Sequence, residues 1–313
     1  MKPLLGIVLA LVLGAVADFP APRWAFPTTL PAPPDPDSTR LHRIPGSDRR
    51  FTQKQAFDRN APVDWFPDSH PAAPRSVMFG RRPAAWACGF CHLHDGAGRP
   101  ENAVLAGLPA EYIVRQVHAI RDGTRRSANP RSPMTSMHMQ AKLYTDAEVA
   151  EAAAYFSRLA LARRNRIVES DSVPRHRVAG VIYARAGTRQ VPIAGRLIEM
   201  PDDFERHALH DPTVRYTTYV PTGSLALGKR LVVQGPAGIA TAGATCHGAA
   251  LLGMGAIPPI AGRSPQYVLR QLISLRTGAR ADSGSAPMMA VVQALTLPQM
   301  VAISAYVGSL EPR

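Results

Sequence analysis

The chain has 313 residues, which is long enough for about two domains. It carries 36 Lys and Arg residues against 23 Asp and Glu, a formal net charge of +13. Beyond the N-terminus no segment is long and apolar enough to cross a bilayer, which excludes a protein with several membrane spans. The basic charge could steer the protein toward acidic proteins or an anionic membrane surface, although a GC-rich genome also explains the many arginines.

The N-terminus is typical of a secretory signal peptide. Met1-Lys2 is a short basic start, Pro3 to Val16 is an apolar run, and Ala15-Val16-Ala17 is a cleavage site of small residues. We expect residues 1–17 to be removed in the periplasm, so that Asp18 begins the mature chain. An uncleaved N-terminal anchor is the alternative. Because the protein is expected to be exported, we do not expect nucleic acid to be its partner.

The stretch after the signal peptide, residues 18–75, is rich in proline and resists regular structure. It contains Trp24 and Trp65. These aromatic residues favour an extended arm that wraps a domain over a disordered leader.

Cys88-Gly89-Phe90-Cys91-His92 is the most specific motif of the chain. The pattern Cys-x-x-Cys-His attaches a c-type haem. Its two thiols can reach both vinyl groups, and the following His can bind the iron. A zinc site usually takes four ligands from separated pairs, whereas Cys88, Cys91, His92 and His94 are crowded along one turn. A thioredoxin-like dithiol would need a βαβ context, which the sequence lacks.

Residues 163–222 favour strands. Val178–Ala184 and Val191–Met200 are β-rich runs, and Ala186-Gly187 between them suggests a turn. We expect a small β-hairpin insert between two helical regions.

The second half of the chain repeats the first at a constant offset of 155 positions. Cys91-His92 falls on Cys246-His247, and Cys88 falls on Gly243. Other matched pairs are Tyr112 with Tyr267, Gln116 with Gln271 and Arg125 with Arg280. The second motif therefore has one cysteine replaced.

Each half continues with matching helices. Middle helices are expected from Pro109 to about Ile120 and from Pro265 to about Leu275, since proline is tolerated at a helix start. Thr145-Asp146-Ala147-Glu148 and Thr296-Leu297-Pro298-Gln299 are typical of the start of a last helix.

On these motifs, the sequence resembles tandem class I c-type cytochromes over residues 76–162 and 223–313. The resemblance implies a mainly α fold with two cytochrome c domains in tandem. The Pro-rich arm at 18–75 and the β-rich connecting segment at 163–222 would be additions. It also implies two haem c groups, each with a Met sulfur on the iron opposite the His.

The Met ligands are expected to be Met137 and Met288, because each lies 18 residues before a tyrosine of the last helix, Tyr155 and Tyr306. Met134 and His138 remain alternatives to Met137. The expected metal ligands are therefore His92, Met137, His247 and Met288.

The second haem would be held by one thioether, from Cys246, with His247 and Met288 on its iron. Two alternatives remain open. The second half could be a remnant without haem, in which Cys246 is a free thiol, or Gly243 could be a change that is not natural.

A His/Met-ligated iron has no open position, so the expected function is electron transfer between redox proteins, without catalysis. The basic charge would favour acidic partners. One alternative is a haem enzyme of the peroxidase or thiosulfate-oxidising type. The other is a cytochrome subunit of a periplasmic dehydrogenase, docked through the arm and the insert. The sequence leaves the oligomeric state open.

Overall fold

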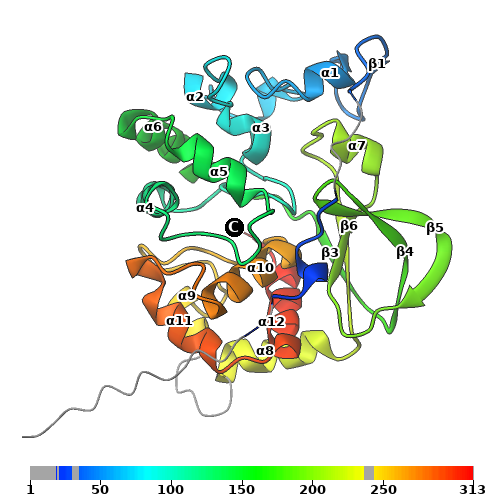
Figure 1. The fold of residues 1–313 in the computed structure, drawn as a ribbon, viewed down its shortest axis with the longest axis vertical. Helices are drawn as coiled ribbons and strands as arrows, with labels where there is room; N and C mark the ends of the chain where they lie inside the picture. Colours follow the sequence, from blue (N-terminus) through cyan, green and yellow to red (C-terminus); the bar gives the residue numbers. More distant parts are fainter. Residues whose placement is uncertain (1–18, 20, 30–34, 236–242, 313) are drawn as a thin grey trace, which may run out of the picture.

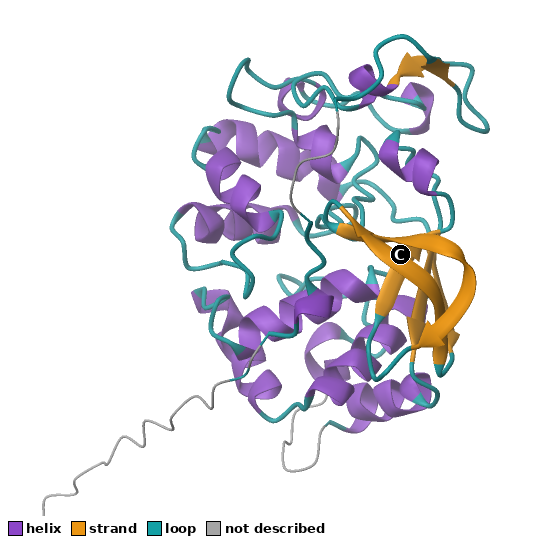
Figure 2. Cartoon of the chain, turned by 45° about the vertical axis from the view of Figure 1, so that its right-hand side comes forward, coloured by secondary structure: helices purple, strands orange, loops and turns teal. Residues whose placement is uncertain are grey.

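Two groups of helices, one from each half of the chain, lie one above the other, with strands along one side (Figures 1 and 2). The computed structural model describes residues 19, 21–29, 35–235 and 243–312. The predicted signal peptide lies outside these residues.

The first group of helices, called the first half below, carries the complete cysteine motif. Its helices are α3 (Cys88–His92), α4 (Ala110–Arg121), α5 (Met134–Ala141) and α6 (Asp146–Ser157). The predicted middle helix is confirmed as α4. The predicted start of the last helix is also confirmed, because the Thr145 hydroxyl accepts from the Glu148 amide and the Glu148 carboxylate accepts from the Thr145 amide.

The second group, called the second half, repeats this order. Its helices are α8 (Ser224–Gln234), α9 (Gly243–His247), α10 (Pro265–Arg276), α11 (Ala286–Gln293) and α12 (Leu297–Ser309), with the 3-10 turn η3 (Ser283–Ser285) before α11. The predicted middle helix is confirmed as α10. Thr296 and Gln299 form the same reciprocal cap at the start of α12.

The connecting segment contains two sheets. Its elements are β3 (Asn165–Glu169), β4 (Ser172–Ala179), β5 (Ile182–Pro192), β6 (Ile198–Pro201), α7 (Phe204–Ala208) and β7 (Tyr216–Val220). β7 lies between β3, to which it is parallel, and β6, to which it is antiparallel. β4 and β5 form a separate antiparallel pair.

The predicted turn of this hairpin at Ala186-Gly187 is wrong. The chain turns instead between Ala179 and Ile182, where Gly180 has a φ of +64°. Gly187, with a φ of +93°, lies inside β5, where the register with β4 shifts between Pro174 and His176. A glycine within a strand pattern can mark a bulge as well as a turn, and here it marks a bulge.

The Pro-rich segment forms short elements and packs on two other parts of the chain. The elements are η1 (Arg23–Ala25), β1 (Leu41–His42), β2 (Phe51–Thr52), α1 (Gln53–Ala56), η2 (Pro67–Ser69) and α2 (Arg75–Met78). The Trp65 indole donates to the Leu209 carbonyl after α7, at 2.8 Å. Gln266 of α10 donates to the Ala25 carbonyl, at 2.7 Å.

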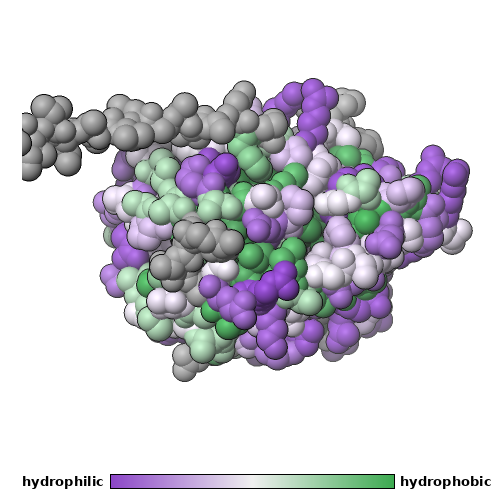
Figure 3. Space-filling model, turned by 90° about the horizontal axis from the view of Figure 1, so that it is seen from below, coloured by the Kyte–Doolittle hydropathy of each residue, from purple (hydrophilic) through white to green (hydrophobic). Residues whose placement is uncertain are grey.

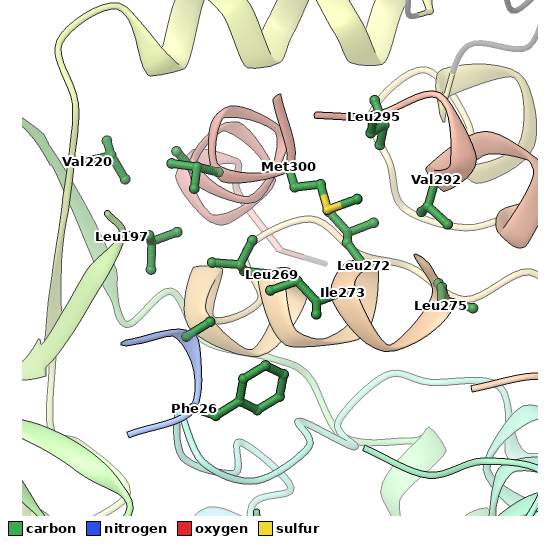
Figure 4. Close-up of a cluster of buried hydrophobic side chains, with 13 residues drawn as sticks. Phe26, Leu197, Val220, Leu269, Leu272, Ile273, Leu275, Val292, Leu295 and Met300 are labelled. Atoms are coloured by element: carbon green, nitrogen blue, oxygen red, sulfur yellow. The ribbon is translucent and has the colours of Figure 1, made fainter. Parts of the chain in front are cut away.

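The largest buried hydrophobic cluster joins this segment to the second half (Figure 4). Phe26 packs beneath α10 beside Leu269 and Ile273, and Met300 of α12 covers the other side of α10. Burying a side chain such as Phe26 contributes about 1.5–3 kcal/mol. The N-terminal segment is therefore part of the core of the second half.

No single helix among the described residues is long and apolar enough to cross a membrane. The segments Ser283–Gln293 and Leu297–Ser309 meet the length and composition criteria only when taken together, and they are bent by 119°.

Candidate functional site

The complete cysteine motif forms the short helix α3, which begins at Cys88 and ends at His92. Both thiols are free and partly buried. Burial raises the pKa of Cys88 to about 12 and that of Cys91 to about 11. A redox-active cysteine has a lowered pKa and an accessible thiolate, so these raised pKa values disfavour a redox dithiol. Among the described residues, no set of three or more His, Cys, Asp or Glu side chains is arranged to hold a metal ion.

The two motif histidines share one hydrogen-bonding arrangement. His92 Nδ1 lies 2.8 Å from the Ala103 carbonyl, and His247 Nδ1 lies 2.9 Å from the Pro258 carbonyl. A carbonyl partner fixes Nδ1 as the donor and leaves Nε2 with a lone pair, as metal-binding histidines require. Burial is the main cause that lowers the pKa of both imidazoles, which favours the neutral form that can bind iron.

The second motif, in helix α9, keeps Cys246 and His247 but has Gly243 in place of the first cysteine. A Cβ atom built on Gly243 would lie 3.7 Å from its nearest neighbour, the Val232 carbonyl oxygen. The described residues around Gly243 therefore leave room for a side chain at this position. Gly89 differs, since a Cβ there would lie 2.7 Å from the Val77 carbonyl oxygen.

The candidate methionines lie on helices α5 and α11. Met134 and Met137 are partly buried, whereas Met139 is 53% exposed. His138 Nδ1 is 2.7 Å from the Ile120 carbonyl, which leaves its Nε2 as a possible ligand atom. His138, like the two motif histidines, has a backbone carbonyl on Nδ1. It is therefore still an alternative iron ligand, and Met137 stays a prediction.

In α11, Met288 and Met289 both pack partly buried against the core of the second half. α5 and α11 start at Met134 and Ala286, which places Met137 level with Met289. The capped starts of α6 and α12, at Thr145 and Thr296, place Met137 level with Met288 instead. Met288 also stays a prediction.

The two halves meet through backbone hydrogen bonds that obey the 155-residue repeat. The Arg126 amide donates to the Ala279 carbonyl at 2.7 Å, and the Ala281 amide donates to the Thr124 carbonyl at 2.8 Å. Arg126 corresponds to Ala281 and Thr124 to Ala279, so exchanging the two halves turns one hydrogen bond into the other. The contact therefore has an approximate two-fold axis, as in a symmetric dimer.

Beside this axis lies a set of side chains, called the interface cluster below, that pairs equivalent residues from the two halves. Its members are Tyr112, Gln116, Arg125, Tyr267, Gln271 and Arg280.

Both arginines of the interface cluster donate to both glutamines. Gln116 Oε1 accepts from Arg125 at 2.6 Å and from Arg280 at 2.9 Å. Gln271 Oε1 accepts from Arg125 at 3.2 Å and from Arg280 at 3.1 Å. Two guanidinium groups thus share neutral acceptors in a largely buried place, and neither Nε atom has a hydrogen-bond partner within the described part of the chain.

Each arginine of the interface cluster also donates to the tyrosine of the other half. Arg125 donates to the Tyr267 hydroxyl at 3.0 Å, and Arg280 donates to the Tyr112 hydroxyl at 3.1 Å. Although burial opposes it, the charges of Arg280 and Arg125 lower the pKa of Tyr112. Such paired positive charges suit anionic groups, and carboxylates above all.

The interface cluster also lies near the first motif. The charge of Arg125 is one of the causes, after burial and with Arg99, that lower the pKa of His92. Sequence reasoning found all six residues as matched pairs but gave them no role. The signal that could have found them is the retention of Tyr, Gln and Arg at equal spacing in both halves.

The chain is similar to several known proteins, although no family model matches it. Cytochrome c4 of Pseudomonas aeruginosa is 26% identical over 233 residues, which cover 72% of this chain and 85% of the relative. A thiosulfate dehydrogenase electron acceptor of Thiomonas intermedia is 24% identical over 255 residues, covering 76% of this chain and 88% of the relative.

A solved structure of thiosulfate dehydrogenase (TsdBA) from Marichromatium purpuratum matches 72% of this chain with 26% identity and a TM-score of 0.49. The match spans 36% of that chain. The sequence relatives named cytochrome c4 confirm the resemblance to tandem c-type cytochromes.

Proposed function

We propose that this protein is a periplasmic dihaem electron carrier. The observation that carries the proposal is the pair of motif histidines, each with Nδ1 on a backbone carbonyl and with Nε2 left for a metal. The similarity to cytochrome c4 and to a thiosulfate dehydrogenase electron acceptor supports the same function. We place the domains at residues 76–162 and 223–313.

Two haem c groups would supply reversible one-electron chemistry at their irons. In the first half, Cys88 and Cys91 would hold the haem through two thioethers, and His92 and Met137 would bind the iron. In the second half, Cys246 would give one thioether, and His247 and Met288 would bind the iron. The donor set fits because burial lowers the pKa of both imidazoles and so favours their neutral form, and because the three thiols form no disulfide among the described residues.

The interface cluster would bind the haem propionates. Its guanidinium groups share neutral hydrogen-bond acceptors, and Asp282 is the one carboxylate among the described residues within ion-pair distance of either. Two propionates would offset the rest of their buried charge. Because each arginine contacts residues of the other half, the cluster would hold both haems at the interface between the halves. Electrons could then pass from one half to the other.

Partners would be redox proteins that contact exposed hydrophobic side chains. Met139 and Leu143 are exposed in the first half, and Val233 and Met254 are exposed in the second. The surface seen from below also shows hydrophobic patches between hydrophilic side chains (Figure 3). A thiosulfate-oxidising system is a candidate source of electrons, since two relatives are named as acceptors for such an enzyme.

A pyridine haemochrome assay combined with intact mass tests this function. We expect two haem masses, with a reduced α-band shifted to the red for the haem that has one vinyl group left. A single haem mass would contradict the proposal for the second half, and no haem would contradict it altogether. Thiosulfate turnover by the purified protein alone would favour the enzyme alternative over the carrier.

A further inference from the structure

A buried acidic side chain at the interface cluster has no acidic counterpart in the other half. Asp282 of the second half corresponds to Ser127 of the first at the 155-residue offset. The Asp282 carboxylate lies 3.6 Å from Arg280 Nε and accepts from the Gln116 amide at 3.5 Å. Ser127 instead accepts from the Asn129 amide at 3.2 Å and offers no charge to Arg125.

Asp282 is buried, with 8% of its surface exposed. Burial alone would favour its neutral form. The Ser285 hydroxyl, the Arg280 charge, the Gln116 amide and, last, the Arg125 charge outweigh this and lower the pKa of Asp282. The side chain is therefore a fixed negative charge beside one of the two equivalent arginines.

Among the described residues, no carboxylate lies within ion-pair distance of Arg125, which is 5% exposed. The local charge around Arg280 thus differs from that around Arg125, because only Arg280 has a carboxylate of the described residues within ion-pair distance. The hydrogen bonds of the two arginines to Gln and Tyr are equivalent in both halves. Charges in a buried site interact more strongly than in water, so this difference is felt by other groups nearby.

We propose that Asp282 makes the surroundings of the two haem sites electrically unequal and so adds to the difference between their reduction potentials. The inference rests on the proposed function. A fixed negative charge favours the more positive, oxidised iron and lowers its potential. Because the equivalent position in the first half is the uncharged Ser127, we expect the Asp282 charge to act more strongly on one iron than on the other.

The symmetry provides a matched pair of variants. Asp282→Asn removes the charge while keeping the size of the side chain, and Ser127→Asp places a charge at the equivalent position. We expect Asp282→Asn to raise both potentials and Ser127→Asp to lower both. We also expect Asp282→Asn to move one haem more and Ser127→Asp to move the other haem more.

The readout is a spectroelectrochemical titration of each two-haem variant, in which the α-band of the single-thioether haem identifies the second half. We expect Asp282→Asn to change the equilibrium constant for electron exchange between the haems about threefold, which is about 28 mV at 59 mV per tenfold. Asp282→Glu should restore the original separation, because it restores the charge.

Equal shifts of both potentials, or no shift, in a protein with two haems would overturn this inference while leaving the proposed function intact. The same holds if Asp282→Asn and Ser127→Asp act most on the same haem. A haem count of one would instead overturn the proposal for the second half, and this inference with it. Circular dichroism of each variant shows whether the fold is retained.

Discussion

Single residues decide how firmly each haem would be attached. Gly89, inside the first motif, has the Val77 carbonyl so close that no side chain fits. Gly243, which replaces the first cysteine of the second motif, has its nearest neighbours at ordinary contact distance. The absent cysteine is thus a difference in chemistry that the surrounding structure does not impose.

Gly243→Cys should therefore complete the second motif. We expect an additional thioether and a blue shift of the α-band in the pyridine haemochrome spectrum, because a second vinyl group is saturated. Cys88→Gly is the matched control, and it should shift the α-band to the red. An unchanged spectrum in Gly243→Cys, with a free thiol detected at residue 243, would contradict the proposed position of the haem.

Glu199 is a buried acid on β6, and its side chain contacts the start of α10. It accepts from the Ser264 hydroxyl and from the Gln266 amide, both at 2.8 Å, while its Oε1 has no hydrogen-bond partner among the residues that the structure describes. Burial raises the pKa of Glu199 from its ordinary 4.5 to about 7. The folded protein therefore binds a proton more tightly than the unfolded chain does between these two values.

Because the folded pKa is the higher one, the free energy of unfolding should fall as the pH rises from about 4.5 to about 7, by about 3 kcal/mol from this group. Glu199→Gln should remove this fall. Urea unfolding near pH 5 and pH 8 measures it, with exposed Glu151→Gln as the control. A Glu199→Gln protein that keeps the full decline would show that Glu199 is not its cause.

At the scale of elements, the N-terminal segment contributes to the core of the second half. Phe26→Ala should destabilise the protein by about 3–5 kcal/mol, because Phe26 is 4% exposed and packs beneath α10. Chemical denaturation measures the change. Phe79→Ala, at a site that is 47% exposed, is the control and should cost less than about 1 kcal/mol. Equal losses would mean that Phe26 has no special part in the core.

The elements that could be predicted from the sequence are those with local signals. α4, α10 and the capped starts of α6 and α12 follow from proline, capping residues and the repeat. The hairpin turn could not be placed, because Gly180 and Gly187 both adopt positive φ and only pairing distinguishes a turn from a bulge.

Contacts between distant parts of the chain could not be predicted from local sequence patterns either. Trp65 and Leu209 are 144 positions apart, and Gln266 and Ala25 are 241 positions apart. The repeat supplied the members of the interface cluster as matched pairs. It could not show that the pairs meet each other, because sequence equivalence says nothing about how two halves are docked.

At the scale of the whole molecule, the net charge of +13 should govern encounters with partners. We expect electron exchange with an acidic redox protein to slow steeply as ionic strength rises, because salt screens charges beyond about 10 Å at 0.1 M. Stopped-flow absorption measures the rate. Exchange with an uncharged mediator is the control and should stay nearly constant. A rate that rises with salt would exclude an acidic partner for this protein.

The approximate two-fold contact has a meaning for how such a molecule can arise. An interface that uses the same surface on both sides can be formed by two copies of one small protein. Here the two copies are joined in one chain, and the strands lie along one side of the pair (Figure 2). Two joined copies need not stay identical, and the halves of this chain differ at Cys88 and Gly243 and at Ser127 and Asp282. A symmetric pair offers a partner two identical faces, whereas this chain offers two that a partner can tell apart.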